Sequence, residues 1–394
     1  MTSNGLLKLF TALFYSTNAL LIPYLPLLLS DRGFDSLEVG TLLMLGPFLA
    51  MFAQPIVGVW SDRIKATKPL LYGLWIAKGL AAACLFLSTG RMMAAVSLLV
   101  LYICFLPAVT LLDTLSVKTA AAANTSYSDI RLWGSVGFTI TALVLGQYFD
   151  LWGGVDSLMW MYLPIWGGLL IGMFLLKEPK VEPTAGTEPA ISWKVVRQAL
   201  SMPSLLIFFG LIFLVAMPHR MNDGLLSLHL SDLGASTAQV SWAWAVAGLS
   251  EIIGFAVMGR IMRRDRMLVM LTVVSFLYVG RWLLYAFVTD PWVVIALQFA
   301  HAFTYVALWV VAIEFVSNVL PQQLAATGQA LLGMVFLGLA GLAGGAAGGA
   351  LQEAYGGTAM YLFGAVCAAL GAVGFLIWRF FREKASEKLM PNAK

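Results

Sequence analysis

The chain has 394 residues, of which 60% are hydrophobic and 11% are charged, and its mean hydropathy is +0.86. Soluble domains carry roughly 25% charged residues, and a water-soluble fold of this size could not bury so much apolar surface. Composition therefore excludes a soluble globular protein and indicates an integral membrane protein. The net charge of +4 reflects loops at the membrane surface, so it gives no reason to expect nucleic-acid binding.

Apolar runs recur along the chain, and each is long enough to cross a bilayer as a helix of about 20 residues. We predict an all-α membrane protein with twelve transmembrane helices, since the short alternating segments of a β-barrel are missing. The predicted spans are residues 6–29, 38–60, 70–89, 93–116, 130–149, 158–176, 203–228, 238–258, 267–288, 291–316, 325–350 and 358–381. The first run is too long for a cleaved signal and lacks a small-residue cleavage site, so we expect a helix there.

Basic residues gather at one end of these spans, whereas the opposite loops hold only Arg32 and Arg91. The positive-inside rule therefore places both termini in the cytoplasm, and we expect a multi-pass protein of the cell membrane. The residues on the basic side are Lys8, Arg63, Lys65, Lys68, Lys118, Arg131, Lys177, Lys180, Lys194, Arg197, Arg260, Arg263, Arg264, Arg266, Arg379, Arg382, Lys384, Lys388 and Lys394.

The three cysteines, Cys84, Cys104 and Cys367, lie within predicted spans at unrelated spacings. They predict packing rather than disulfides or a metal site. The sequence also has no convincing phosphate-binding loop, zinc-ligand cluster or nucleophile triad. We expect neither an enzyme nor a bound metal or cofactor.

A long polar segment, residues 177–202, is rich in proline and charge and predicts a linker between two halves of six helices each. The predicted units are an N-terminal bundle at 1–176, a cytoplasmic linker at 177–202, a C-terminal bundle at 203–382 and a cytoplasmic tail at 383–394.

The two halves resemble each other at an offset of 201 residues. LLLSDRGFDSLEVG at 27–40 aligns without gaps to LHLSDLGASTAQVS at 228–241, and Asp113 falls on Glu314. Several matches at one offset predict a duplication. A direct repeat of six helices keeps its orientation in the membrane, as in transporters whose halves rotate about a central site.

The loop after the second span reads G-x-x-x-D-R-x-K, which resembles the loop signature of the major facilitator superfamily. The resemblance implies two six-helix bundles and a gating role for this loop. The family's usual glycine is missing at 64–66, and a merely topogenic basic loop is the alternative reading. The gating candidates are Gly58, Asp62, Arg63 and Lys65, with Gly259, Arg263 and Arg264 in the weaker copy between the eighth and ninth spans.

Several ionisable residues lie inside the predicted spans. A charge near the bilayer centre costs at least about 2.5–3.5 kcal/mol on insertion scales, so each should face a cavity or a partner. These residues are Lys78, Asp113, His219, Arg220, Glu251, Arg281, His301 and Glu314.

Arg281 needs a counter-charge, because a guanidinium does not deprotonate in proteins, and Glu251 is the nearest candidate in depth. If a substrate anion competed for Arg281, the displaced glutamate would take up a proton, which offers a route to proton coupling. A structural ion pair between two helices is the alternative. His301 is a candidate proton relay, and Gln298 lies one turn before it on the same face.

A narrower resemblance follows from RLWGSVGF at 131–138, PHRMNDG at 218–224 and GRW at 280–282. These strings look like the phenylpropionate permease branch of the superfamily, and RLWGSVGF is similar to the matching segment of lactose permease-type proton symporters. The resemblance implies that Asp113 and Arg131, eighteen positions apart, form an acid–arginine pair at the substrate site. Asp113 and Glu314 are alternatively two symmetric acids that lock a closed gate.

By the same resemblance, Arg281 and His301 match an arginine and a histidine used in coupling and substrate binding, and Glu251 matches an acid of the sugar site. Thr304 stands where that family has its proton-carrying glutamate. Another group must then carry protons, and Glu251 is our first candidate. Sodium is the alternative coupling ion.

Four further residues complete the candidate site. Lys78 either neutralises an anionic substrate or pairs with an acid across the cavity, and Asn18 supplies a neutral hydrogen bond. His219 and Arg220 lie in the outer part of the seventh span.

These observations predict a monomeric secondary transporter that takes up a small organic solute with protons by alternating access. The family resemblance implies an aromatic carboxylate, a sugar or a nucleoside. A proton-driven efflux antiporter for drugs or metabolites is the first alternative. A receptor or scaffold that kept a transporter fold is the second, and the buried charges argue against it.

Overall fold

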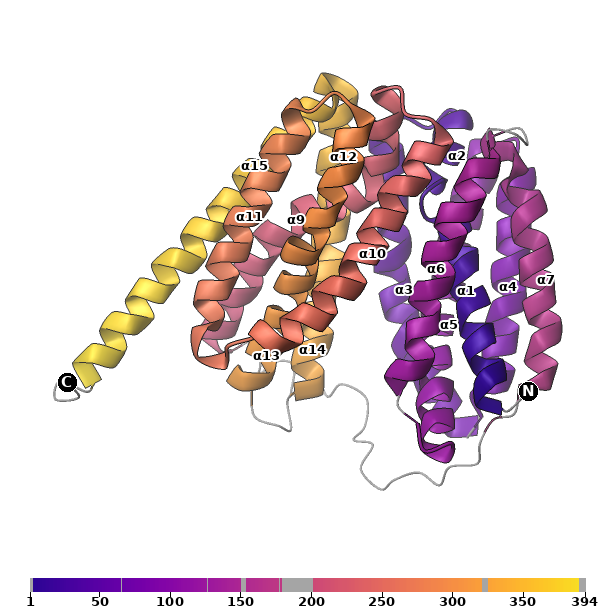
Figure 1. Cartoon of the computed structure of the whole chain (residues 1–394), viewed down its shortest axis with the longest axis horizontal. Helices are drawn as coiled ribbons and strands as arrows, with labels where there is room; N and C mark the ends of the chain where they lie inside the picture. The colour runs from indigo at the N-terminus through magenta and orange to yellow at the C-terminus, as the bar shows by residue number, and fades with distance from the viewer. Residues whose placement is uncertain are drawn as a thin grey trace.

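The computed structural model describes residues 3–64, 66–125, 127–149, 154–176, 178, 201–320 and 325–389, and each regular element in these ranges is a helix (Figure 1). The first half contains α1 (Ser3–Leu21), α2 (Leu25–Asp31), α3 (Ser36–Ile64), α4 (Lys68–Leu87), α5 (Arg91–Ala122), α6 (Tyr127–Phe149), η1 (Gly154–Ser157) and α7 (Leu158–Leu175). The second half contains α9 (Pro203–Asp232), α10 (Thr237–Ile261), η2 (Arg264–Arg266), α11 (Met267–Phe287), α12 (Pro291–Leu297), η3 (Gln298–Ala300), η4 (Ala302–Val306), α13 (Ala307–Val319), α14 (Ala325–Gly333), η6 (Met334–Leu339) and α15 (Ala340–Leu389).

Ten helical runs among the described residues are long and apolar enough to cross a membrane, which supports the predicted all-α membrane fold. The predicted count of twelve differs from this number for two reasons. One run, Gly328–Phe381, is 54 residues long and joins the last two predicted spans, and α6 is not among the ten. Within the long run, Gly356 has φ 79° and ψ 175°, a conformation that glycine adopts readily and that turns the chain between the two predicted helices.

The first predicted span, 6–29, is not one continuous helix. A turn at residues 22–24 separates α1 from α2. Pro23 lies in this turn and Pro26 lies in the first turn of α2. Proline has no N–H to donate within a helix but is tolerated in the first turn, so the two prolines explain both the break and the new start.

The duplicated sequence forms the same turn twice. Gly33 and Gly234, 201 residues apart, have φ of 82° and 81°. Their N–H groups donate to the carbonyls of Ser30 and Ser231 at 2.9 Å, and the next residues reach back five positions. Both helices therefore end in a Schellman motif, which requires a left-handed residue.

The helices after these turns also begin alike. Asp35 accepts from the N–H of Glu38 at 2.8 Å and Glu38 accepts from the N–H of Asp35 at 3.0 Å. Ser236 and Gln239 exchange the equivalent bonds at 3.2 and 2.9 Å. Reciprocal bonds of this kind form a capping box. Equal caps at an equal offset support the duplication.

Helices of the two halves lie in two neighbouring groups in Figure 1, and α7 ends and α9 begins at the same end of the molecule. We call this end, where α3 finishes and α4, α6 and α14 begin, the linker end. Between the groups, α3 contacts α15 and α9, and α6 contacts α10.

The opposite end is closed by close backbone packing between α3 and α15. A Cβ on Gly40 would overlap the carbonyl oxygen of Gly345, and a Cβ on Gly349 would overlap the backbone of Ser36. The N–H of Ser36 also donates to Glu353 at 2.9 Å. Glycine at these positions lets the helices of the two halves touch, because small residues permit close backbone approach.

At the linker end, Glu178 holds the start of α4. Its carboxylate accepts from the N–H groups of Thr67 and Lys68 at 2.8 and 3.0 Å and from the ammonium of Lys118 at 3.0 Å. Burial acts to raise the pKa of Glu178, but the bonds from Lys68, Thr67 and Lys118 outweigh it and lower the pKa. An anion at the N-terminus of a helix is stabilising.

Much of the predicted gating machinery falls outside the described residues. Lys65 and linker residues 177 and 179–200 lie outside them, as do the side chains of Asp62 and Arg264 and the end of the predicted tail, 390–394. Arg63 is exposed, and Arg263 lies 3.6 Å from Asp265 in the second copy of the loop. Gating by these loops stays a prediction.

Candidate functional site

A cavity of about 1040 Å³ lies between the two groups of helices. Helices α1, α3, α5 and α6 line it from the first half, and α9, α10, η3, η4, α14 and η6 line it from the second. Its wall reaches Gly58, Arg131 and Ala330 at the linker end, whereas the contacts of Gly40 with Gly345 close the other end. The cavity therefore extends from the middle of the helices toward the linker end.

Arg281 is buried behind the cavity wall, only 3% exposed. Its guanidinium donates to Thr304 Oγ1 at 2.8 Å and to Gln298 Oε1 at 2.9 Å, and it lies 3.4 Å from His301 Nδ1. Gln298 and His301 line the cavity and Arg281 itself does not. Arg281 was expected to face a cavity or a partner. It does not lie on the cavity surface, and it contacts two residues that do, Gln298 and His301.

Glu251 reaches Arg281 through a histidine. The carboxylate lines the cavity and lies 2.9 Å from His301 Nε2, while Nδ1 of the same ring faces Arg281. The expected direct ion pair between Glu251 and Arg281 is replaced by this three-member chain. Thr304, where a glutamate was expected from the family pattern, supplies Arg281 with a neutral acceptor.

The backbone widens at this chain of side chains. Residues Ala302–Val306, directly after His301, form a π-helical turn, and a second π-helical segment at Met334–Leu339 lies on the cavity wall. Such turns interrupt an α-helix at a cost and often mark functional sites.

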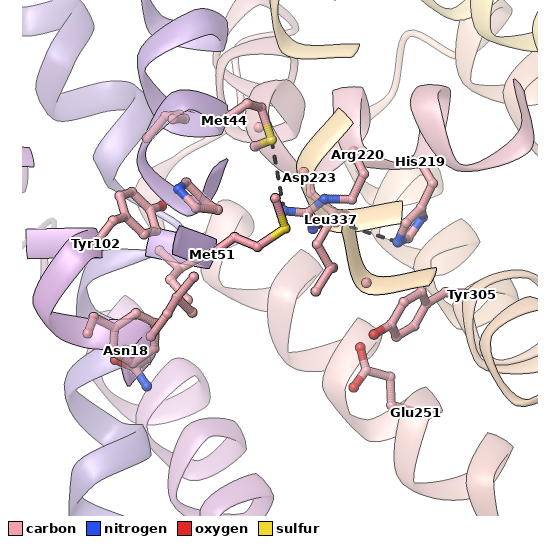
Figure 2. Close-up of a pocket in the computed structure, with 18 of the residues that line it drawn as sticks. Asn18, Met44, Met51, Tyr102, His219, Arg220, Asp223, Glu251, Tyr305 and Leu337 are labelled. Carbon is pink, nitrogen blue, oxygen red and sulfur yellow. Dashed lines mark hydrogen bonds and ion pairs between the residues drawn. The ribbon is translucent and has the colours of Figure 1, made fainter. Parts of the chain in front are cut away.

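Three residues on one face of α9 form a second polar cluster. Arg220 Nη1 lies 2.6 Å from Asp223 Oδ2, and His219 Nε2 lies 3.5 Å from the same oxygen. The His219 ring stacks on Tyr305, with centroids 4.8 Å apart. All four residues line the cavity, and Figure 2 shows Arg220, Asp223 and His219 grouped above Tyr305 and Glu251.

Asp223 was not among the predicted site residues. A signal for it was present, because it follows His219 by four residues and Arg220 by three, the spacings at which side chains meet on a helix. The charged pair in one turn of an apolar helix was sufficient to indicate a partner for Arg220.

Lys78 is fully buried and lies among aromatic rings. Its ammonium donates to Thr17 Oγ1 at 3.1 Å and to Asn18 Oδ1 at 3.2 Å, and it lies 4.7 Å from the ring centroids of both Trp75 and Phe105. Lys78 does not line the cavity, but Asn18 does. The contacts found for Lys78 in the described part of the chain are thus neutral groups, and the expected acid partner is not among them.

The remaining predicted site residues divide into one that lines the cavity and two that do not. Arg131 lines the cavity and its guanidinium lies 4.2 Å from the centroid of the Tyr15 ring. Asp113 and Glu314 are half-buried and are not part of the cavity wall. Glu314 accepts from the side-chain amide of Asn318 at 3.1 Å. The described geometry thus places Arg131, but neither of the symmetric acids, on the cavity.

Known proteins resemble this chain along most of its length. A model of the MFS_1 like family matches residues 6–363. The chain belongs to this family. It is therefore a transporter of the major facilitator type rather than an enzyme.

Two curated relatives show how far the similarity extends. The chain is 24% identical over 381 residues to a maltose permease of Geobacillus stearothermophilus, covering 96% of this chain and 95% of that protein. It is 24% identical over 220 residues to a probable 3-phenylpropionic acid transporter of Escherichia coli (strain K12), covering 54% and 55%. The second match agrees with the resemblance to phenylpropionate permeases.

Solved structures confirm the fold. The crystal structure of the nucleoside transporter NupG superposes with a TM-score of 0.83 at 16% identity, covering 96% of this chain and 99% of that one. At this identity the likeness carries the architecture alone. The family match and the apolar helices together identify a multi-pass membrane transporter.

Proposed function

We propose that the protein is a proton-coupled secondary transporter that takes a small organic solute into the cell. The solute classes suggested by the relatives are an aromatic carboxylate, a sugar or a nucleoside, since the similar proteins carry the names of a maltose permease, a 3-phenylpropionic acid transporter and a nucleoside transporter. The protein acts as a monomer, and protons and the lipid bilayer are its other partners.

The proposed architecture is two six-helix bundles, at 1–176 and 203–382, with twelve membrane-spanning helices. The count follows if α6 crosses the membrane and α15 is divided at Gly356. The protein lies in the cell membrane. The basic residues at the linker end indicate that this end faces the cytoplasm. The cavity at the linker end and the closed packing at the other end correspond to an inward-open state of an alternating-access cycle.

The observation that carries the proposed coupling is the chain from Glu251 through His301 to Arg281. Glu251 is 39% exposed at its side chain, so cavity water and solute reach it, whereas Arg281 is buried. A proton on Glu251 neutralises the carboxylate that His301 Nε2 contacts, which weakens this contact and frees His301 to change its partner. The solute and the proton then act on one connected set of side chains, which is what coupling between two ligands requires.

Uptake into proteoliposomes with an imposed pH gradient tests the proposal. An acidic exterior drives accumulation if the protein is a symporter, whereas gradient-driven expulsion identifies the antiporter alternative. Absence of flux rejects transport by this mechanism.

Glu251→Gln tests the proton carrier. The variant keeps the hydrogen-bonding shape but cannot change charge, so we expect it to lose accumulation against a gradient while it still exchanges solute. Asp156→Asn, which removes an exposed carboxylate in η1, serves as the matched control and keeps accumulation. If Glu251→Gln accumulates solute like the parent, Glu251 does not carry the proton.

A further inference from the structure

We propose that Arg220 is the anchor for a carboxylate group on the transported solute, and that the solute is a monocarboxylate with an apolar, preferably aromatic, body. The inference rests on the proposed function, since it assumes that the cavity is the solute site. It selects one of the three solute classes and assigns the residue that recognises it.

Arg220 lines the cavity, and one edge of its guanidinium lacks a strong acceptor among the described residues. Of the three guanidinium nitrogens, Nη1 donates to Asp223, at 2.6 Å. Nε is buried and makes no hydrogen bond within the described ranges. A buried donor without an acceptor is destabilising, so an acceptor supplied by a ligand at this edge would remove that cost.

The acceptor that faces Nη2 is a weak one. This nitrogen contacts the thioether sulfur of Met44, 3.9 Å away on α3, and Figure 2 shows the Met44 sulfur above the guanidinium and Met51 just below it. A thioether is a poor hydrogen-bond acceptor, and methionine changes rotamer readily. A carboxylate would therefore displace Met44 and bind the Nε–Nη2 edge with two parallel bonds, the geometry that arginine favours.

A glycine, Gly341, borders this edge of the guanidinium. A Cβ on Gly341 would lie 3.7 Å from Nε of Arg220 and 3.4 Å from the sulfur of Met44. Gly341 thus leaves a methyl-sized space next to both atoms. Alanine there would fill the space at ordinary contact distances without changing any charge.

The fixed charges around the cavity favour an anion. The cavity wall carries two guanidinium groups, Arg131 and Arg220, and two carboxylates, Asp223 and Glu251. Directly behind the wall, Arg281 contacts Gln298 and His301 through its nitrogens. With this third guanidinium, the described groups at the cavity carry an excess of positive charge, and an anionic solute offsets it.

The rest of the wall suits an apolar body. Tyr102, Phe105 and Phe138 line the cavity from the first half, and Tyr305 lines it from the second. In Figure 2, Tyr102 lies across the opening from Arg220. Aromatic side chains bind apolar rings through their faces and edges. A sugar, with hydroxyls on every side, would leave many of its polar groups against these rings.

Binding to the purified protein tests the anchor without any gradient. The probes are 3-phenylpropionate and its neutral isostere 3-phenylpropanamide, with maltose and uridine as members of the other two classes. A ligand that binds only the folded state raises the apparent melting temperature, and the shift grows with the ratio of its concentration to its dissociation constant. We expect 3-phenylpropionate to raise it and the amide to fail at equal concentration.

Variants of the pair Arg220–Asp223 then assign the recognition. Arg220→Gln lowers the affinity for 3-phenylpropionate by about 10- to 150-fold, the value of a charge-assisted hydrogen bond. Arg220→Gln/Asp223→Asn removes both charges together and keeps the packing, so it gives the same loss if the single variant does not fold. Arg91→Gln, an exposed arginine outside the cavity, binds like the parent.

Two further variants separate an anchor from a structural ion pair. Asp223→Asn leaves Arg220 without its internal carboxylate and tightens 3-phenylpropionate binding, whereas a mere ion pair predicts no gain. Gly341→Ala weakens binding by filling the space beside Nε. The inference is overturned if millimolar 3-phenylpropionate does not bind, if the amide binds equally well, or if Arg220→Gln binds the carboxylate like the parent.

The results that would reject the proposed function differ from those that would reject Arg220 as the carboxylate anchor. If the protein binds 3-phenylpropionate through Arg220 but a pH gradient drives no accumulation, proton coupling is wrong and the anchor stands. If a pH gradient drives accumulation of maltose or uridine while the carboxylate does not bind, the anchor is wrong and proton-coupled transport stands.

Discussion

A methyl group at Gly40 should open the closed end of the transporter. In the closed packing a Cβ on Gly40 would overlap the carbonyl oxygen of Gly345 and lie 3.0 Å from its carbonyl carbon. A backbone carbonyl in another helix cannot move aside as a flexible side chain can, so α3 and α15 must separate. Overpacking of this kind costs roughly 1–3 kcal/mol. The cost applies only where the helices touch, so Gly40→Ala shifts the equilibrium away from the closed packing by roughly 5- to 150-fold.

Distances between spin labels at Leu37 and Tyr355 report this change, because both residues are exposed at the closed end, on α3 and α15. The labels are attached to cysteines in a background that lacks Cys84, Cys104 and Cys367. We expect a longer distance to gain population in Gly40→Ala. Gly73→Ala is the matched control, since it gives the same gain in helix propensity in α4 with no atom within 4 Å of its Cβ. An unchanged distance distribution in Gly40→Ala would refute the role of this contact.

Two further predictions concern stability. Glu178→Gln should lower stability at neutral pH by about 1–2 kcal/mol, since it weakens the bonds to the start of α4. The folded state lowers the pKa of Glu178. The stabilisation by Glu178 is therefore present above the ordinary glutamate pKa of about 4.3 and is lost as pH falls through the lower pKa of the folded state. Melting curves of the parent and Glu178→Gln at a series of pH values check this, and a difference between them that persists at the most acidic pH contradicts it. The Lys78→Met variant should have a melting temperature equal to or above that of the parent, because it removes a buried ammonium whose described contacts are neutral groups. A large drop in the melting temperature would show that the hydrogen bonds to Thr17 and Asn18 outweigh the desolvation cost of the ammonium.

Local sequence features were sufficient for most of the fold. Apolar runs located the helices because a helix in lipid must be apolar and about 20 residues long. The match of Gly33 to Gly234 anticipated two equal turns, since a Schellman motif needs a residue that tolerates positive φ. The last two predicted spans, 325–350 and 358–381, left a gap in which Gly356 turns the chain. The break at Pro23 was missed, because the first predicted span ran through it, although proline disrupts helices by known means.

The candidate site was only partly accessible from the sequence. Glu251, His301, Gln298 and Arg281 stood out because ionisable and polar groups are costly in lipid, and the structure brings them together. Which of these side chains contact one another did not follow from their depth in the membrane alone. Depth paired Glu251 with Arg281 directly, whereas the packing of α10, α11 and the π-helical turn inserts His301 between them.

What the sequence determined by itself is the set of groups that must avoid lipid, the duplicated scaffold that carries them and the end of the molecule that is basic. These properties depend on the cost of exposing each residue to lipid, which is local. The tertiary structure decided which groups share a surface: it enclosed Lys78 in aromatic rings, placed Arg281 behind the wall and left the Nε edge of Arg220 beside Gly341. Side-chain partners across helices depend on helix rotation and crossing, which residue spacing within one helix does not specify.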